Sequence, residues 1–276
     1  MALWGGRFSS ETRNEVTQYS ESISFDQRLY HFDIAGSKAH VTMLAEQGII
    51  PAETAKAIRE ELDRIERRID AGEFRYDIAM EDIHMHIESA LIEALGAEGA
   101  RVHSARSRND QVALDIRLYL RSEVDSLIAE LRHFQRALVA QAGAHPRTVM
   151  PGFTHLQHAQ PVLFAHHLLA YVEMLDRDAE RLAGCRERIN VMPLGSGAIA
   201  GSTLPINRER VCEELGFSRV TRNSMDAVAD RDFAIELVSD LAIFAMHTSR
   251  LSEDLILWCS QEFDFIELDD AFCTGS

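Results

Sequence analysis

Three long stretches of the chain carry apolar residues at helical spacing, and they constrain the fold more than any other feature. In each stretch the apolar residues recur every three or four positions, which keeps them on one face of an α-helix. The first stripe consists of Val112, Ile116, Leu120, Val124, Leu127, Leu131, Phe134 and Leu138. The second begins at Pro161 and continues past Leu182 towards Ile189, and the third contains Phe233, Leu237, Leu241, Phe244, Thr248, Leu251, Leu255 and Trp258. Each stretch is roughly 30 residues long, against a mean of about 11–12 for globular helices, so the sequence predicts a bundle of long helices.

Shorter helical patterns precede the long ones. Pro51 is placed to open a helix that Gly72 ends, and residues 81–96 begin with acidic residues and end at Gly96. No alternating pattern typical of strands rivals these segments. We therefore predict an all-α chain with a small helical N-terminal domain at residues 1–105 and a central long-helix bundle domain at residues 106–276.

The composition limits the class of protein. Acidic residues outnumber basic ones 44 to 28 in the 276 residues, which gives a net charge of −16. That charge repels nucleic acid and anionic membrane surfaces, so we expect neither as a partner. The chain starts without a signal-peptide pattern, has no apolar stretch long enough to cross a membrane, and has no CxxC pair among its four cysteines. We therefore expect a cytoplasmic protein with reduced cysteines.

The segment PGFTHLQHAQP, residues 151–161, holds two histidines between two prolines. A metal site is disfavoured, because neither cysteine nor carboxylate is near enough in sequence to give His155 and His158 a third ligand. A polar turn is the ordinary alternative. Proton transfer is the third, because an imidazole changes charge near neutral pH, and Thr154 adds a hydroxyl donor suited to a carboxylate substrate.

The segment HSARSRNDQ, residues 103–111, lies directly ahead of the first long helix. It fits a variant of the capping box, in which Ser107 caps the helix and Asp110 supports it. It also fits an anion site, in which the unpaired amides of the helix start act with Arg106, Ser107, Arg108 and Asn109. The two readings are compatible.

Two further polar clusters also lie at predicted helix starts. In EDIHMHIES, His84 and Glu88 share a helix face, which is too few ligands for a metal site. The segment fits a solvated helix start, and Asp82 and His84 remain candidates for a polar site. In NSMDAVADRDF, residues 223–233, Asp226 or Asp230 fits a helix cap. Arg231 is a cation in a first helical turn, which is unfavourable without a nearby anion, and that anion is either a ligand or simply Asp230 or Asp232. A third segment, VMPLGSGAIAGSTLPIN, is rich in glycine but has neither a phosphate-binding loop nor a nucleophile elbow.

Eight motifs in the chain resemble the argininosuccinate lyase family of the fumarase and aspartase superfamily. They are LWGGRF at 3–8, DIAGSKAH at 33–40, EDIH at 81–84, RSRNDQ at 106–111, PGFTHLQHAQP at 151–161, PLGSGAIAG at 193–201, NSMDAVADRDF at 223–233 and SEDLILW at 252–258. The resemblance implies reversible β-elimination of argininosuccinate to arginine and fumarate, with no cofactor and no metal. It also implies a homotetramer whose long helices form one central bundle.

The resemblance also implies roles for individual residues. His155 matches the catalytic histidine of the family. The residues that match its substrate-binding positions are Ser22, Asp26, Asp82, His84, Ser107, Arg108, Asn109, Thr154 and Arg231. In the elimination, fixed donors aimed at the charge that develops on a carboxylate should matter most, with two proton carriers for the two proton transfers.

The chain ends DDAFCTGS, at the point where the family carries a loop of pattern GSSxMPxKxNP with a catalytic serine. By resemblance the chain is truncated before the last bundle helices and the C-terminal domain, and we expect it to be inactive alone. Two alternatives stay open. One is another fumarate-forming lyase, such as adenylosuccinate lyase, and the other is a crystallin-like structural protein on the same scaffold.

Overall fold

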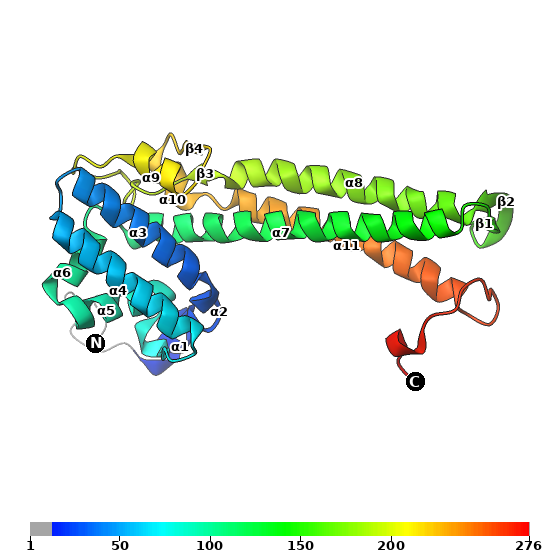
Figure 1. Ribbon diagram of the computed structural model, residues 1–276, viewed down its shortest axis with the longest axis horizontal. Coiled ribbons are helices and arrows are strands. Elements are labelled where there is room, and N and C mark those ends of the chain that lie inside the picture. Colours follow the sequence, from blue (N-terminus) through cyan, green and yellow to red (C-terminus); the bar gives the residue numbers. More distant parts are fainter. Residues whose placement is uncertain (1–12, 276) are drawn as a thin grey trace. The chain divides into compact units, whose positions relative to one another are not determined.

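The computed structural model of the chain describes residues 13–275, so the motif LWGGRF at 3–8 lies outside the described residues (Figure 1). The helices are α1 (Asn14–Ser20), α2 (Ile23–Asp26), α3 (Tyr30–Glu46), α4 (Ala52–Asp70), α5 (Ile83–Leu95), α6 (Ala97–Ala100), α7 (Arg108–Ala144), α8 (Phe164–Ile189), α9 (Arg208–Glu214), α10 (Ser224–Ala229) and α11 (Asp232–Trp258). The strands are β1 (Val149–Thr154), β2 (Gln157–Leu163), β3 (Val191–Met192) and β4 (Arg219–Val220). Short 3-10 turns occur at Gln27–Leu29, Ile78–Met80, Arg101–His103 and Asp270–Phe272.

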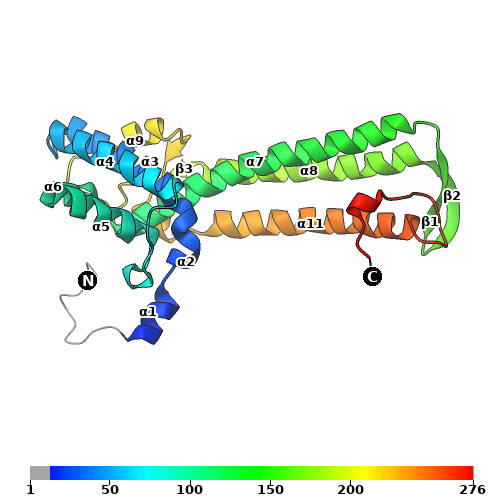
Figure 2. The ribbon, with the colours of Figure 1, turned by 60° about the horizontal axis from the view of Figure 1, so that its bottom comes forward.

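The long helices that the apolar stripes predict are present. Helix α7 has 37 residues, α8 has 26 and α11 has 27. These lengths are two to three times the mean for globular proteins, although α8 and α11 are shorter than predicted. In Figures 1 and 2, α8 runs beside the later part of α7. The prediction of a mainly helical, long-helix fold is confirmed.

Contacts divide the chain into two compact units, and the division differs from the predicted ranges 1–105 and 106–276. The first unit comprises the chain up to Ser122 with Ile189–Asp230, and the second comprises Glu123–Arg188 and the chain from Arg231 onwards. The difference arises because the first part of α7 packs with the short N-terminal helices, and a later segment returns to them. A compact unit of contacts is not the same as a domain that folds alone, so the predicted domain ranges remain a prediction.

The core of the first unit lies among α3, α4 and α5. Helix α4 begins after Pro51, presents Ile58, Leu62 and Ile65 at helical spacing, and buries each of them completely. Gly72 follows the helix with a φ of +69°, the left-handed conformation that ends many helices. Helices α3, α4 and α5 contact one another, and Leu114 and Leu118 of α7 join the same core.

Polar contacts tie the three helix segments of the second unit together. Gln135 of α7 donates from Nε2 to the carbonyl oxygen of Val172 in α8 at 2.9 Å. His247 of α11 lies 2.7 Å from Asp178 of α8 through its Nδ1 atom, and both side chains are buried. The unit is therefore held by buried hydrogen bonds as well as by its apolar stripes.

A hairpin forms where the sequence predicts a loop followed by a helix from Pro161. Strands β1 and β2 pair antiparallel, with Pro151 opposite Pro161 and Thr154 opposite Gln157, so α8 begins only at Phe164. His155 and Leu156 form the turn with φ values of +53° and +56°. Two positive φ values fit a two-residue type I′ turn, which usually contains asparagine or glycine. The prediction of a helix start at Pro161 is wrong, because backbone pairing extends the hairpin through Leu163.

Among residues 13–275 the structure shows no helix that combines the length and the apolar character needed to cross a membrane.

Candidate functional site

The segment that contains Ser22 and Asp26 packs against the start of α5. Ser22 Oγ donates to Asp26 Oδ2 at 2.6 Å, and Asp26 Oδ1 accepts a hydrogen bond from the backbone N–H of Ile83 at 3.1 Å. The backbone N–H groups of Ser22 and Ile23 donate to the carbonyl oxygen of Glu81. Burial of Asp26 raises its pKa, although the bond from Ser22 opposes that change. The contacts place Ser22 and Asp26 beside the segment EDIH at residues 81–84.

Asp82 connects the start of α5 to the start of α7. Its Oδ1 atom accepts from the backbone N–H of Met85 at 2.7 Å and caps α5, while its Oδ2 atom lies 3.5 Å from Nε of Arg108. Arg108 also lies 3.4 Å from Glu88 through Nη2. Because the three side chains are mostly buried, these ion pairs are less screened than surface pairs. The structure therefore brings the polar segments EDIHMHIES and HSARSRNDQ together.

The first turn of α7 forms the predicted variant of the capping box. Ser107 Oγ accepts from the backbone N–H of Asn109 at 3.2 Å, and Asp110 Oδ1 accepts from the backbone N–H of Ser107 at 2.9 Å. The sequence gives no sign of the second function of Asp110, whose Oδ2 atom accepts from the N–H groups of Gly195 and Gly197 at 3.0 and 2.8 Å. The glycine-rich loop is thereby bonded to the helix start that carries Asn109.

His84 lies behind these residues in a buried network. Its Nδ1 atom lies 3.0 Å from Asp33 Oδ1 and 3.2 Å from Asp115 Oδ2, and Gln111 donates a further hydrogen bond to Asp33. The exposed fraction of the His84 side chain is 2%. Burial by itself would lower the pKa of His84, but the two carboxylates outweigh it and raise the pKa to about 10. His84 is therefore an imidazolium between two carboxylates, and the side chain does not face solvent within the chain.

Asp33, His84 and Asp115 also have the residue types of a metal site. One ligand atom from each lies within 4.8 Å of the others, and all three residues are buried. The buried guanidinium of Arg106 interacts electrostatically with both carboxylates. Burial and the neighbouring Asp33 raise the pKa of Asp115 to about 7, whereas the pKa of Asp33 is lowered. The positive charges of His84 and Arg106 therefore at least match the negative charges without a metal ion, and these residues fit a protein-only network better than a metal centre.

Thr154 and His155 belong to the second unit, at the tip of the β1–β2 hairpin. Both side chains are exposed, and the His155 imidazole makes no hydrogen bond within residues 13–275. Arg231 precedes α11 in the same unit, and its carbonyl oxygen accepts from Ala234 and Ile235 at 3.0 and 3.2 Å. Contacts within the chain therefore link predicted site residues of the first unit to one another. Thr154, His155 and Arg231 belong to the second unit.

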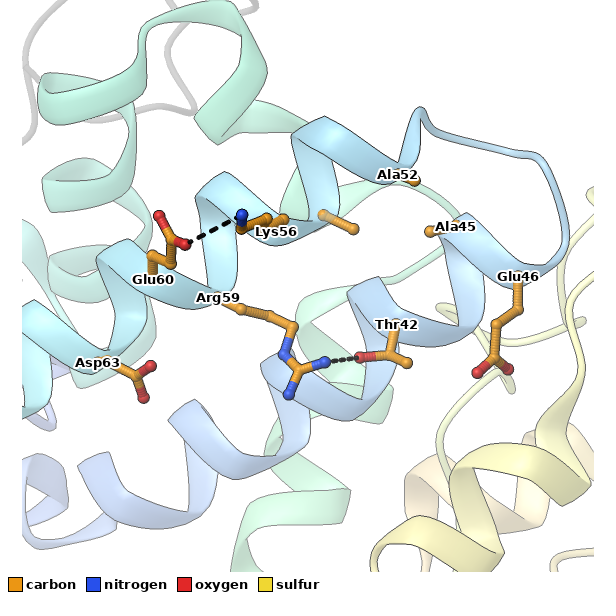
Figure 3. Close-up of a pocket in the computed structure, with 9 residues that line it drawn as sticks. Thr42, Ala45, Glu46, Ala52, Lys56, Arg59, Glu60 and Asp63 are labelled. Carbon is orange, nitrogen blue, oxygen red and sulfur yellow. Dashed lines mark hydrogen bonds and ion pairs between the residues drawn. The ribbon is translucent and has the colours of Figure 1, made fainter.

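A groove lies between α3 and α4, and none of the predicted site residues lines it (Figure 3). Its volume is about 370 Å³, and Arg59 donates from Nη1 to Thr42 Oγ1 at 3.3 Å across it. Lys56 and Glu60 lie 3.9 Å apart along its rim. The other charged side chains that line it also have partners, since Glu46 pairs with Arg210 and Asp63 pairs with Lys38, so the groove offers no unpaired charge to a ligand.

Comparison with known proteins gives the family. The family model described as "Lyase" matches residues 6–276. The chain belongs to the lyase family. It is 56% identical over 274 residues to a protein of Pelobacter propionicus named argininosuccinate lyase, covering 99% of this chain and 60% of that relative. It is 55% identical to a protein of the same name from Geobacillus thermodenitrificans, with the same coverage.

The similarity extends to solved structures. A crystal structure of EDDS lyase in complex with formate matches with a TM-score of 0.83 and 32% identity, covering 93% of this chain and 50% of the other. A structure titled fumarate lyase:delta crystallin from Brucella melitensis has a TM-score of 0.74 at 20% identity, which shows the fold alone. The lyase chain described here spans about 60% of the length of the curated relatives that it matches.

Proposed function

We propose that the complete protein is an argininosuccinate lyase, which cleaves argininosuccinate reversibly to L-arginine and fumarate in arginine biosynthesis. The observation that carries the proposal is the identity of 56% over 99% of the chain with a relative of that name. The contacts at the start of α5 support it. Asp26, which bonds to the backbone of Ile83, holds the Ser22 hydroxyl there, and Asp82 holds the Arg108 guanidinium, and both of these groups are donors suited to a dicarboxylate.

The proposed chemistry is a β-elimination. A base removes a proton from the carbon beside a carboxylate of the succinyl group, and the electron pair of that C–H bond forms the double bond of fumarate. The C–N bond breaks, and the guanidino nitrogen leaves as arginine after it takes up a proton. Negative charge builds on the carboxylate during this step, so fixed donors around it stabilise the transition state.

In this proposal His155 carries one of the two protons. The type I′ turn supports the assignment, because it holds an exposed imidazole in a backbone conformation that residues other than glycine rarely adopt. Thr154, Asn109, Ser107, Ser22 and Arg231 supply donors to the substrate, and Asp82 and Asp26 hold the donors in place. His84 is assigned to the same site as a positioning residue, because its buried side chain contacts Asp33 beneath the substrate-binding residues.

We further infer that the protein acts as a homotetramer in the cytoplasm and needs neither cofactor nor metal. Exposed apolar side chains on α11 support self-association, among them Ile235 and Val238 with exposed fractions of 65% and 67%. Apolar surface of this kind on a helix is stabilised when another helix covers it.

The test is an assay of the complete gene product, with fumarate release followed by its ultraviolet absorbance. We expect fumarate from argininosuccinate and none from adenylosuccinate. His155→Asn should remove most of the turnover and leave the tetramer intact in sedimentation, whereas His158→Asn, a matched change in the same hairpin, should leave turnover near wild type.

Three results would contradict the proposal. Fumarate released only from adenylosuccinate would indicate another lyase of the family. A stable tetramer without turnover on either substrate would indicate a structural protein on this scaffold. Full turnover in His155→Asn would remove that residue from the mechanism.

A further inference from the structure

Asp110 is the most completely bonded carboxylate near the candidate site. It is fully buried, and it accepts backbone hydrogen bonds from Ser107 at 2.9 Å, Gly195 at 3.0 Å and Gly197 at 2.8 Å. The first donor lies at the start of α7, and the other two lie more than 80 residues later in the chain. Capping of α7 requires only the hydrogen bond from the Ser107 backbone, so it does not explain the hydrogen bonds from the two glycines.

The loop that Asp110 holds has a backbone that only glycine adopts easily. The φ values are +87° at Gly195, +60° at Gly197 and +82° at Gly201. A Cβ atom at Gly197 would lie 2.5 Å from the carbonyl oxygen of Gly201, so the loop closes tightly on itself. Ser196 strengthens the loop by donating from Oγ to the carbonyl oxygen of Pro193 at 2.6 Å.

The same loop orients the side chain of Asn109. Its Nδ2 atom donates to the carbonyl oxygen of Ala198 at 3.1 Å. Because a carbonyl oxygen only accepts, this contact fixes which end of the amide faces the loop. The second N–H and the Oδ1 atom make no other hydrogen bond within the described residues, and the side chain is exposed.

We propose that Asp110 is a positioning residue for substrate binding, which fixes the glycine-rich loop so that the carbonyl of Ala198 presents the Asn109 amide to a dicarboxylate. The proposal rests on the proposed function, in which Asn109 binds substrate. Asp110 does not touch the substrate, since it is enclosed by three backbone amides. Its effect on turnover passes through Asn109.

A double-mutant cycle in the complete gene product tests the proposal. Asp110→Asn keeps the shape of the side chain but replaces one accepting oxygen by a donor that faces backbone N–H groups. We expect it to raise KM for argininosuccinate by between about tenfold and a hundredfold, as a small misplacement of a binding group does. Asn109→Ala should raise KM by a similar factor, and the KM of the double variant should be no higher than that of Asn109→Ala alone. Asn207→Ala, which removes the cap of the nearby helix α9, is the control for lost stability and should leave KM unchanged.

Hydrogen exchange of peptides that cover residues 195–201 provides a readout independent of turnover. Asp110→Asn should expose these amides to exchange, whereas Asn109→Ala should leave Gly195 and Gly197 protected. If Asp110→Asn does not fold, Ser196→Ala loosens the same loop without leaving a buried charge, and it should raise KM and exchange in the same direction.

Different results overturn the inference and the proposed function. The positioning role is wrong if Asn109→Ala raises KM and the double variant raises it by the product of the two single effects. It is also wrong if Asp110→Asn leaves either KM or the hydrogen exchange of the loop unchanged. If the wild-type protein neither turns over argininosuccinate nor binds fumarate, the proposed function fails. The hydrogen-exchange experiment does not depend on turnover, so unchanged exchange of the loop in Asp110→Asn would still show that Asp110 does not fix the loop.

Discussion

Replacing His84 by asparagine should destabilise the first unit by several kcal/mol. The exposed fractions of the His84, Asp33 and Asp115 side chains are 2%, 1% and 1%, so water cannot compensate for a lost charge. Removing one partner from a buried, hydrogen-bonded ion pair costs about 3–5 kcal/mol, because it leaves an uncompensated charge behind. Since domains are stable by only about 5–15 kcal/mol, the variant should approach the limit of folding.

The assay is urea denaturation followed by far-UV circular dichroism, with hydrogen exchange of α3, α5 and α7 peptides to assign the loss to the first unit. Removing a carboxylate as well should restore the charge balance. We therefore expect His84→Asn/Asp115→Asn to be more stable than the sum of the single changes predicts, by at least about 1 kcal/mol.

The pH dependence has a defined sign. The pKa of His84 is raised to about 10 in the folded chain from an ordinary value of 6.5, so the folded state retains a proton that the unfolded state releases. The stabilisation is complete below about pH 6.5 and is lost as the pH rises towards 10. His84→Asn should remove this part of the pH dependence. A cost below about 1 kcal/mol, or strictly additive single changes, would refute the buried charge network.

Two further changes test other parts of the first unit. Gly197→Ala should lower the free energy of unfolding by at least about 1 kcal/mol, because alanine is strained at a φ of +60° and its Cβ atom meets the carbonyl of Gly201. The control is Gly143→Ala in α7, where a Cβ atom meets nothing within 4 Å, and it should leave stability unchanged or slightly higher. Equal effects of the two changes would refute the loop geometry. His40→Gln should reduce the loss of stability in acid, because burial and then the charge of Arg106 lower the pKa of His40 to about 3 in the folded chain. Between pH 6.5 and 5 the wild type should lose about 2 kcal/mol of unfolding free energy that the variant keeps. Parallel curves of melting temperature against pH for the two proteins would contradict this.

The sequence predicts helices α4, α5 and α7 well, because each has a clear local signal. Helix α4 has Pro51 before it, Gly72 after it and an apolar stripe between them, and α7 has both a capping box and a stripe. The hairpin at residues 149–163 has no such signal. Its strands do not alternate between apolar and polar residues, its turn contains His155 and Leu156 in place of asparagine and glycine, and prolines lie within both strands.

The site was predictable where its contacts are local and not where they are distant. The bond from the Ser107 backbone to Asp110 spans three residues, and the sequence indicates it. The hydrogen bonds that Gly195 and Gly197 donate to Asp110 join two segments, and nothing in the sequence of either segment indicates this contact. The same limit applies to His84, whose partners Asp33 and Asp115 come from two other helices. Only a resemblance to a family places such residues together from sequence.

A crystal structure of the complete, assembled protein with fumarate bound would test the central claim most directly. The account predicts that a carboxylate of fumarate accepts hydrogen bonds from Asn109 and Thr154, contributed by the same or neighbouring copies, with the His155 imidazole within hydrogen-bond distance of the ligand. Fumarate bound elsewhere, with Asn109 and Thr154 in separate pockets of the assembled protein, would contradict it.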